Sequence, residues 1–218
     1  MVLFVGSEFR RKGLADLIRA MGPDITLLVV GQGERLGYYQ KLAQKHGVSE
    51  RVFFKGLTDN VRHFYAAADV VALPSLREAF GMSILEAMAC GLPVVSSAAT
   101  GVAGIIEDGK NGYIFKDSRQ IGSILQLLKA ADLRRSIGRR ARLTAEKHTW
   151  EATASIYEDL CLKIAREKKI SPAALFYRRW SKRDLYFAST PLICYKPYTA
   201  SIHSVGVLKG LPNRSGEK

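Results

Sequence analysis

Two glutamates, Glu78 and Glu86, lie on either side of Gly81 in a segment bounded by two short apolar runs. The pattern predicts a strand, a loop with Glu78, a helix over residues 82–90 with Glu86, and a second strand. In open parallel sheets, ligands bind where the carboxyl end of a strand, the following loop and a helix N-terminus meet. We therefore expect a phosphate group at this helix N-terminus.

The residue types in this segment suit a phosphorylated sugar. Gly81 lets the backbone approach an anion closely, and the free amides of Gly81, Met82 and Ser83 form an anion site with the helix dipole. Glu86 suits a vicinal diol such as a ribose, because a carboxylate accepts two hydrogen bonds. Glu78 would lie on the other side of a diphosphate, toward a sugar. The alternative is two exposed glutamates around an ordinary helix.

Other ligand chemistry is disfavoured by the pattern. Gly31 and Gly33 follow the second predicted strand, whereas a nicotinamide-binding turn follows the first strand and opens a helix at its third glycine. The next glycine here is Gly37. The four histidines share no metal-site spacing, and the three cysteines are too widely spaced for a zinc cluster or a disulfide framework. We expect no metal and no bound cofactor.

Strand and helix patterns alternate along the chain, which is the signature of repeated βαβ units. They predict an α/β fold with a Rossmann-like parallel sheet and helices on both faces. We expect a folded domain over residues 1–169 and a partly irregular basic and aromatic extension over residues 170–218. The predicted strands cover residues 2–6, 26–30, 52–54, 69–73, 93–96 and 113–115. The predicted helices cover residues 12–21, 35–46, 59–67, 82–90, 118–130, 132–146 and 150–168.

Residues 74–95 as a whole resemble the Glu-x7-Glu motif of the retaining glycosyltransferases of family 4, whose GT-B fold has two Rossmann-like domains. Seven residues separate Glu78 from Glu86, as that motif requires. Residues 4–14 and 100–113, with an Asp-Gly-x-Asn-Gly turn, resemble the same family. Ala103-Gly104 stands where most members have Pro-Glu, a change that is similar to the lipopolysaccharide core glucosyltransferases.

The resemblance implies roles for individual residues. It places Glu78 at the donor sugar and Glu86 at the ribose, and it assigns the diphosphate to Arg11 and Lys12, with Arg10 as a neighbouring alternative. Fixed cations stabilise a leaving group that gains negative charge, without a metal. A solvated helix start is a poor explanation for basic residues, because the helix dipole favours acids there. The implied catalytic residues are Glu78, Arg11 and Lys12. The implied donor-binding residues are Gly6, Gly31, Gly33, Phe80, Gly81, Met82, Ser83 and Glu86.

The resemblance covers residues 1–169 and corresponds to a C-terminal donor-binding domain. It implies retaining transfer of a hexose from a nucleotide-diphosphate sugar, with UDP-hexose expected, to a cell-envelope glycan or lipid-linked acceptor. The acceptor site would lie on an N-terminal domain, which we expect on a separate polypeptide or removed from this chain. The nucleotide sugar is then a substrate, and no cofactor is expected.

The formal net charge is +13, and its distribution is uneven. Residues 1–169 hold 25 Lys and Arg against 18 Asp and Glu, whereas residues 170–218 hold 8 against 2. Such an excess favours anionic partners. We expect a cytoplasmic protein, without signal peptide or membrane span, that contacts the inner face of the membrane. The alternative is a non-catalytic remnant or interaction module that docks through its basic tail. Binding of single-stranded nucleic acid ranks third, because no nucleic-acid motif is present.

Overall fold

The computed structural model describes residues 1–167. Residues Met1–Tyr157 form one compact unit. The predicted boundary at residue 169 and the predicted extension over residues 170–218 lie outside the described residues. Within residues 1–167, no helix is long and apolar enough to cross a membrane.

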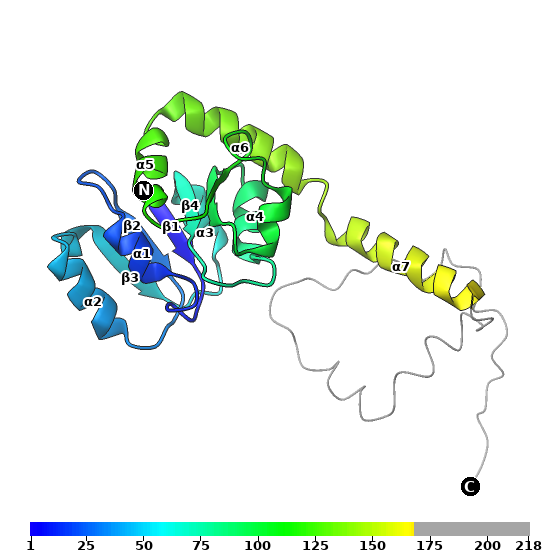
Figure 1. Cartoon of the computed structure of the whole chain (residues 1–218), viewed down its shortest axis with the longest axis horizontal. Helices are drawn as coiled ribbons and strands as arrows, with labels where there is room; N and C mark the ends of the chain where they lie inside the picture. The colour runs from blue at the N-terminus through cyan, green and yellow to red at the C-terminus, as the bar shows by residue number, and fades with distance from the viewer. Residues whose placement is uncertain (168–218) are drawn as a thin grey trace, which may run out of the picture. The chain divides into compact units, whose positions relative to one another are not determined.

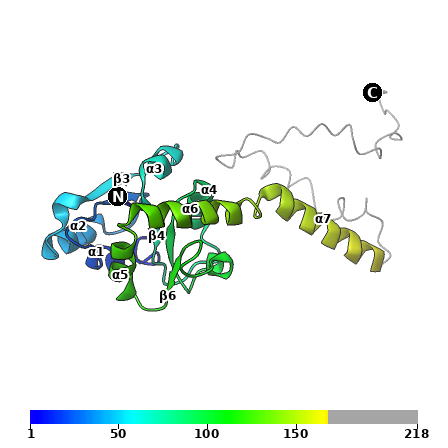
Figure 2. The same ribbon diagram turned by 90° about the horizontal axis from the view of Figure 1, so that it is seen from above.

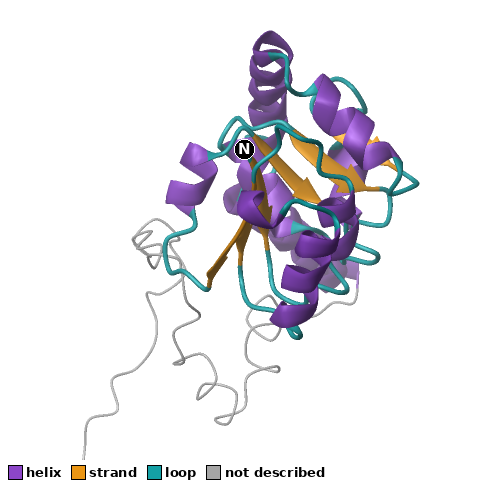
Figure 3. Ribbon diagram, turned by 90° about the vertical axis from the view of Figure 1, so that its left-hand side faces the viewer, coloured by secondary structure: helices purple, strands orange, loops and turns teal. Residues whose placement is uncertain are grey.

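Six parallel strands form one sheet in the order β3-β2-β1-β4-β5-β6. This is the strand order of the doubly wound Rossmann fold, so the predicted fold class is confirmed. The strands lie side by side among the helices in Figures 1 and 3. Each strand lies within two residues of its predicted position at either end. The strands are β1 (Val2–Val5), β2 (Leu27–Val30), β3 (Val52–Gly56), β4 (Val70–Leu73), β5 (Val94–Ser97) and β6 (Tyr113–Phe115).

Strands β1 and β4 form because their side chains are apolar on both faces, whereas β5 begins with two valines and ends with Ser96 and Ser97. Every residue of β4 and of β5 is buried, as expected for a parallel sheet covered by helices on both sides. Leu3, Phe4 and Val71 are fully buried in the same core. The sheet therefore gives the loops at its carboxyl edge a rigid support.

Helices cover both faces of the sheet, as predicted. In Figure 2, α3 and α4 lie on one side of the strands, and α1 and α5 lie on the other. The α4 helix packs against both β4 and α6. The helices are α1 (Leu14–Arg19), α2 (Leu36–Lys45), α3 (Arg62–Ala67), α4 (Met82–Ala89), α5 (Gln120–Leu127), α6 (Ala131–Ala145) and α7 (Trp150–Glu167).

Three helices are shorter than predicted by three or more residues. The helix predicted over residues 12–21 begins only at Leu14, because Gly13 has a left-handed backbone with φ of 72°. The helix predicted from residue 59 begins at Arg62, since the backbone amide of Asn60 donates to the Thr58 hydroxyl at 3.1 Å in a local turn. In the helix predicted over residues 118–130, the Gln120 side chain accepts from the backbone amides before it, and the helix begins there.

Within residues 1–167, the structure also contains two short 3-10 helices that the sequence did not indicate. They cover Ser49–Arg51 and Gly101–Ile105. The second lies beside the loop that carries Glu78, because the amide of Gly101 donates to the Glu78 carbonyl at 3.2 Å.

Candidate functional site

The candidate site lies where the strand order reverses, between the adjacent strands β1 and β4. The chain leaves β1 toward α1 on one face of the sheet and leaves β4 toward α4 on the other. A crevice therefore opens between the two loops, which is where doubly wound sheets bind ligands. The loops are also in direct contact, since the Leu76 amide donates to the Arg11 carbonyl at 2.8 Å.

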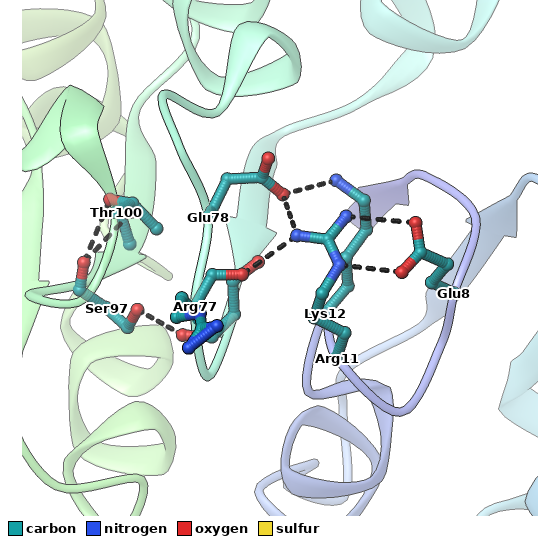
Figure 4. A network of polar contacts seen from close by, with 9 residues as sticks. Glu8, Arg11, Lys12, Arg77, Glu78, Ser97 and Thr100 are labelled. Carbon is teal, nitrogen blue, oxygen red and sulfur yellow. Dashed lines mark hydrogen bonds and ion pairs between the residues drawn. The ribbon is translucent and has the colours of Figure 1, made fainter.

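Charged side chains from the two loops meet across this crevice. The Lys12 Nζ lies 2.8 Å from the Glu78 Oε2, and the Arg11 Nη1 lies 3.1 Å from the same oxygen. Arg11 also donates to the Arg77 carbonyl at 2.8 Å and to the Glu8 carboxylate at 2.8 Å. Figure 4 shows Arg11 and Lys12 pointing toward Glu78. The structure thus brings together the three residues predicted to be catalytic.

The two cations keep the Glu78 carboxylate charged. Burial by itself raises the pKa of Glu78, but the hydrogen bonds and charges of Lys12 and Arg11 outweigh burial and hold that pKa below its ordinary value of 4.5. The side chains of Lys12 and Glu78 are each only 15% exposed, so solvent screens this pair weakly. The arrangement is a preformed ion cluster in which Lys12 and Arg11 share one oxygen of Glu78, while Arg11 also pairs with Glu8.

The start of α4 faces the same loops with unpaired backbone donors. Gly81 has a φ of 104°, and no side chain caps the helix. A Cβ at Gly81 would lie 3.2 Å from the Val102 side chain, so both backbone conformation and space favour glycine. The Ile84 amide donates to the Gly81 carbonyl at 2.9 Å. The amides of Met82 and Ser83 precede this first intrahelical bond and are available to an anion.

Glu86 is exposed on α4, and its orientation is set by a neighbour from α3. The hydroxyl of Tyr65 donates to the Glu86 Oε2 at 2.8 Å and to the Ser83 carbonyl at 3.2 Å. Tyr65 is 2% exposed, and burial followed by the Glu86 charge raises the pKa of its hydroxyl. Tyr65 is not among the predicted site residues, because its only local signal in the sequence is an aromatic residue in an amphipathic helix.

The remaining predicted residues occupy distinct places around the crevice. The Lys12 side chain passes over Gly6, where a Cβ would lie 2.5 Å from the Lys12 Cδ. Gly31 follows β2 and donates its amide to the Gly56 carbonyl at 2.9 Å. Phe80 is half-buried, and its carbonyl accepts from the Val102 amide at 2.7 Å. Gly6 therefore has a packing reason to be glycine as well as its predicted donor-binding role.

A cavity of about 1010 Å³ lies beside the crevice. It is lined by the loops after β1 and β2 and by α1 and α2, including Gln32, Gly33 and Tyr38, and it reaches Arg11 and Leu76. Gly33 is thus the one predicted donor-binding glycine that lines it. No residue of α4 lines this cavity. The cavity adjoins the Arg11 side of the charged cluster, whereas the predicted phosphate position lies on the α4 side.

No metal-binding cluster is present in the part of the chain that the structure describes. Within residues 1–167, no group of three or more His, Cys, Asp or Glu side chains is placed to hold a metal ion. The local positive charge near Glu78 comes from Arg11 and Lys12.

The doubly wound sheet, with the charged cluster at its switch point, defines a Rossmann-like domain. Residues 1–144 match the family described as "Glycosyl transferases group 1". The N-acetyl-alpha-D-glucosaminyl L-malate synthase of Bacillus anthracis is 34% identical over 173 residues, which cover 75% of this chain and 45% of that protein. The lipopolysaccharide glucosyltransferase WaaG of Escherichia coli (strain K12) is 34% identical over 157 residues, which cover 67% and 42%.

The fold comparison agrees with the sequence comparison. The crystal structure of Anabaena Alr3699/HepE in complex with UDP-glucose matches with a TM-score of 0.66 and 28% identity, over 73% of this chain and 48% of that one. This chain belongs to the group 1 glycosyl transferases, which confirms the resemblance drawn from residues 4–14, 74–95 and 100–113. The chain spans less than half the length of these three proteins.

Proposed function

We propose that this domain binds a nucleotide-diphosphate sugar, with a UDP-hexose as the donor, in the crevice between the loops after β1 and β4. The observation that carries the proposal is the 2.8 Å contact between the Lys12 Nζ and the Glu78 Oε2. It joins a cation predicted to hold the diphosphate to a carboxylate predicted to contact the sugar. Support also comes from HepE, a protein of similar fold that was crystallised with UDP-glucose.

The parts of the donor then have separate places. The diphosphate lies between the α4 amides and the cations Arg11 and Lys12, because both supply positive potential. The ribose diol binds Glu86, whose carboxylate is exposed and held by Tyr65. The hexose extends toward Glu78. The predicted donor-binding residues Gly6, Gly31, Gly33, Phe80 and Met82 shape the backbone around these groups.

In the proposed reaction, an acceptor hydroxyl attacks the anomeric carbon on the face from which the diphosphate departs. The bond between that carbon and the diphosphate oxygen breaks, and the departing oxygen takes the hydroxyl proton. Arg11 and Lys12 stabilise the charge that develops on the leaving group. The anomeric configuration is retained. The acceptor is a cell-envelope glycan or a lipid-linked glycan, and it requires an acceptor-binding domain besides this one.

We further propose that these two cations serve in place of a divalent metal. Arg11 and Lys12 each contact an oxygen of the Glu78 carboxylate. Each can therefore contact an anionic phosphate oxygen at a similar distance. We expect the calorimetric Kd for UDP to be the same in EDTA and in MgCl2. Binding that disappears in EDTA would contradict the metal-independent proposal and leave the nucleotide site itself intact.

Replacement of Glu86 tests the proposed site. We expect wild-type protein to bind UDP and UDP-glucose with micromolar to millimolar Kd in calorimetry. Glu86→Ala removes both acceptors for the ribose diol, so we expect the Kd to rise by at least about tenfold, which corresponds to about 1.4 kcal/mol.

The matched control is Glu50→Ala. Glu50 is an exposed glutamate just before β3, so it lies at the amino-terminal end of that strand, whereas the site lies at the carboxyl ends of the strands. We expect Glu50→Ala to bind UDP as the wild type does. Absence of nucleotide binding by the wild-type protein would refute the proposed function. Equal losses in both variants would show that Glu86 has no specific role.

We also propose a peripheral contact with anionic membranes through residues 170–218, based on their 8 Lys and Arg against 2 Asp and Glu. This contact is compatible with a lipid-linked acceptor. Membrane contact is also expected of a non-catalytic docking module. Nucleotide binding distinguishes that module from a transferase domain, because only the transferase domain needs it. The charged crevice favours the transferase.

A further inference from the structure

The backbone of Glu78 is held by the loop that follows β5. The Glu78 amide donates to the Ala99 carbonyl at 3.2 Å, and the Gly101 amide donates to the Glu78 carbonyl at 3.2 Å. These two bonds form an isolated parallel bridge between Glu78 and Thr100. The position of the Glu78 Cα therefore depends on where residues 99–101 lie.

Buried hydroxyl groups in turn hold that loop. The Thr100 Oγ1 donates to the Ser97 carbonyl at 3.0 Å and lies 2.9 Å from the Ser96 Oγ. The Ser97 hydroxyl donates to the carbonyl of Ser75, three residues before Glu78. Figure 4 shows Ser97 and Thr100 on the side of Glu78 away from Lys12. The loop after β5 is thus tied both to its own strand and to the loop after β4.

Water cannot readily replace these hydroxyl contacts. Ser75, Ser96, Ser97 and Thr100 are between 0% and 7% exposed. A buried carbonyl or hydroxyl that loses its partner stays unsatisfied, so the hydroxyl contacts select one conformation of the loop. Thr100 is central because its side chain bonds to the end of β5 while its backbone lies opposite Glu78.

We infer that Thr100 and Ser97 are positioning residues, which place the Glu78 carboxylate between Lys12 and Arg11 through the backbone bridge at residue 100. Neither residue needs to contact a substrate for this role. A purely structural role would affect stability alone. A positioning role also changes the electrostatic environment of Glu78 in protein that remains folded.

The pKa of the Glu78 carboxyl group, measured by carbon-detected NMR titration of the full chain, tests the inference. In wild-type protein the cations lower this pKa. Thr100→Val keeps the side-chain shape and removes the hydroxyl, so we expect the Glu78 pKa to rise toward 4.5. Thr100→Ser keeps the hydroxyl and should preserve the low value. The Glu78 carboxyl resonance is assigned as the one that is absent from the spectrum of Glu78→Gln.

The matched control is Thr26→Val. It removes a hydroxyl at the amino-terminal end of β2, whereas Glu78 follows the carboxyl end of β4. It should leave the Glu78 pKa unchanged. If Thr100→Val does not fold, Ser97→Ala takes its place, since it removes only the bond to the Ser75 carbonyl. A folded variant of either kind with an unchanged Glu78 pKa would overturn the inference.

A second measurement rests on the proposed function. If Glu78 contacts the donor hexose, the affinity for UDP-glucose relative to UDP should fall by about 3- to 10-fold in Thr100→Val, which corresponds to the loss of one hydrogen bond. Thr100→Ser should restore it. A wild type that binds neither ligand would refute the proposed function, whereas the NMR titration would still decide the positioning role.

Discussion

At the scale of single residues, the charge of the Glu78 carboxylate contributes to the stability of the fold. Its side chain is 15% exposed and contacts Lys12 and Arg11 through one oxygen. Because the folded-state pKa lies below the ordinary 4.5, the ionised pair stabilises the fold above that pH. That contribution is lost as the pH falls through the folded-state value. We expect Glu78→Gln to lower the free energy of unfolding by about 1–2 kcal/mol at pH 7.

Urea unfolding of wild-type and Glu78→Gln protein at several pH values between 7 and about 3 measures this contribution. The difference between the two proteins should shrink as the pH falls below 4.5. The matched control is Glu107→Gln. Glu107 also contacts a lysine, at 3.0 Å, but its side chain is 67% exposed, so we expect almost no effect. A difference that is independent of pH would mean that the charge of Glu78 does not stabilise the fold.

At the scale of elements, the contact between α3 and α4 fixes the carboxylate predicted to bind the ribose. Tyr65 on α3 bonds to both Glu86 and Ser83 on α4. Tyr65→Phe removes the hydroxyl and keeps the ring, so we expect a loss of stability of about 1–2 kcal/mol, measured by urea unfolding. Glu86 also loses its orientation, so we expect calorimetry to show weaker UDP binding, with a smaller effect than in Glu86→Ala.

The control at this scale is Tyr113→Phe on β6, whose hydroxyl makes no hydrogen bond to other residues of the described part of the chain. It should affect neither stability nor UDP binding. If Tyr65→Phe lowered stability but left the UDP affinity unchanged, the contact would hold the two helices together without orienting Glu86.

At the scale of the whole molecule, the separation of charge predicts where an anionic surface binds. Residues 170–218 hold 8 of the 33 Lys and Arg but only 2 of the 20 Asp and Glu. We expect the full chain to float with vesicles that contain phosphatidylglycerol and to be released by salt, because exposed charges are screened at high ionic strength. A chain that ends at residue 169 should float much less.

Vesicles of phosphatidylcholine alone provide the control for this experiment, since they lack the net negative charge. Equal, salt-insensitive flotation of the full and shortened chains would reject membrane docking through the basic segment. UDP binding by both chains would show that the nucleotide site does not depend on residues 170–218.

The sequence alone determined the order of strands and helices and the fold class, and it predicted which residues form the candidate site. These features are local: hydrophobic periodicity defines the elements, and Glu78, Gly81 and Glu86 lie within one strand-loop-helix unit. The basic pair Arg11 and Lys12 was found separately, from the loop after the first strand. Helix starts were less accurate, because the turns before α1 and α3 depend on single backbone and side-chain contacts.

Only the tertiary structure decided which distant residues meet. Lys12 and Glu78 are 66 positions apart, and they pair because β1 and β4 are neighbours in the sheet. The same holds for Tyr65 beside Glu86 and for Thr100 opposite Glu78. Periodicity carries no information about such contacts, since it describes how each segment folds and not how the sheet orders the strands. The contacts of the site residues with residues far away in the sequence are therefore set by the order of the strands in the sheet.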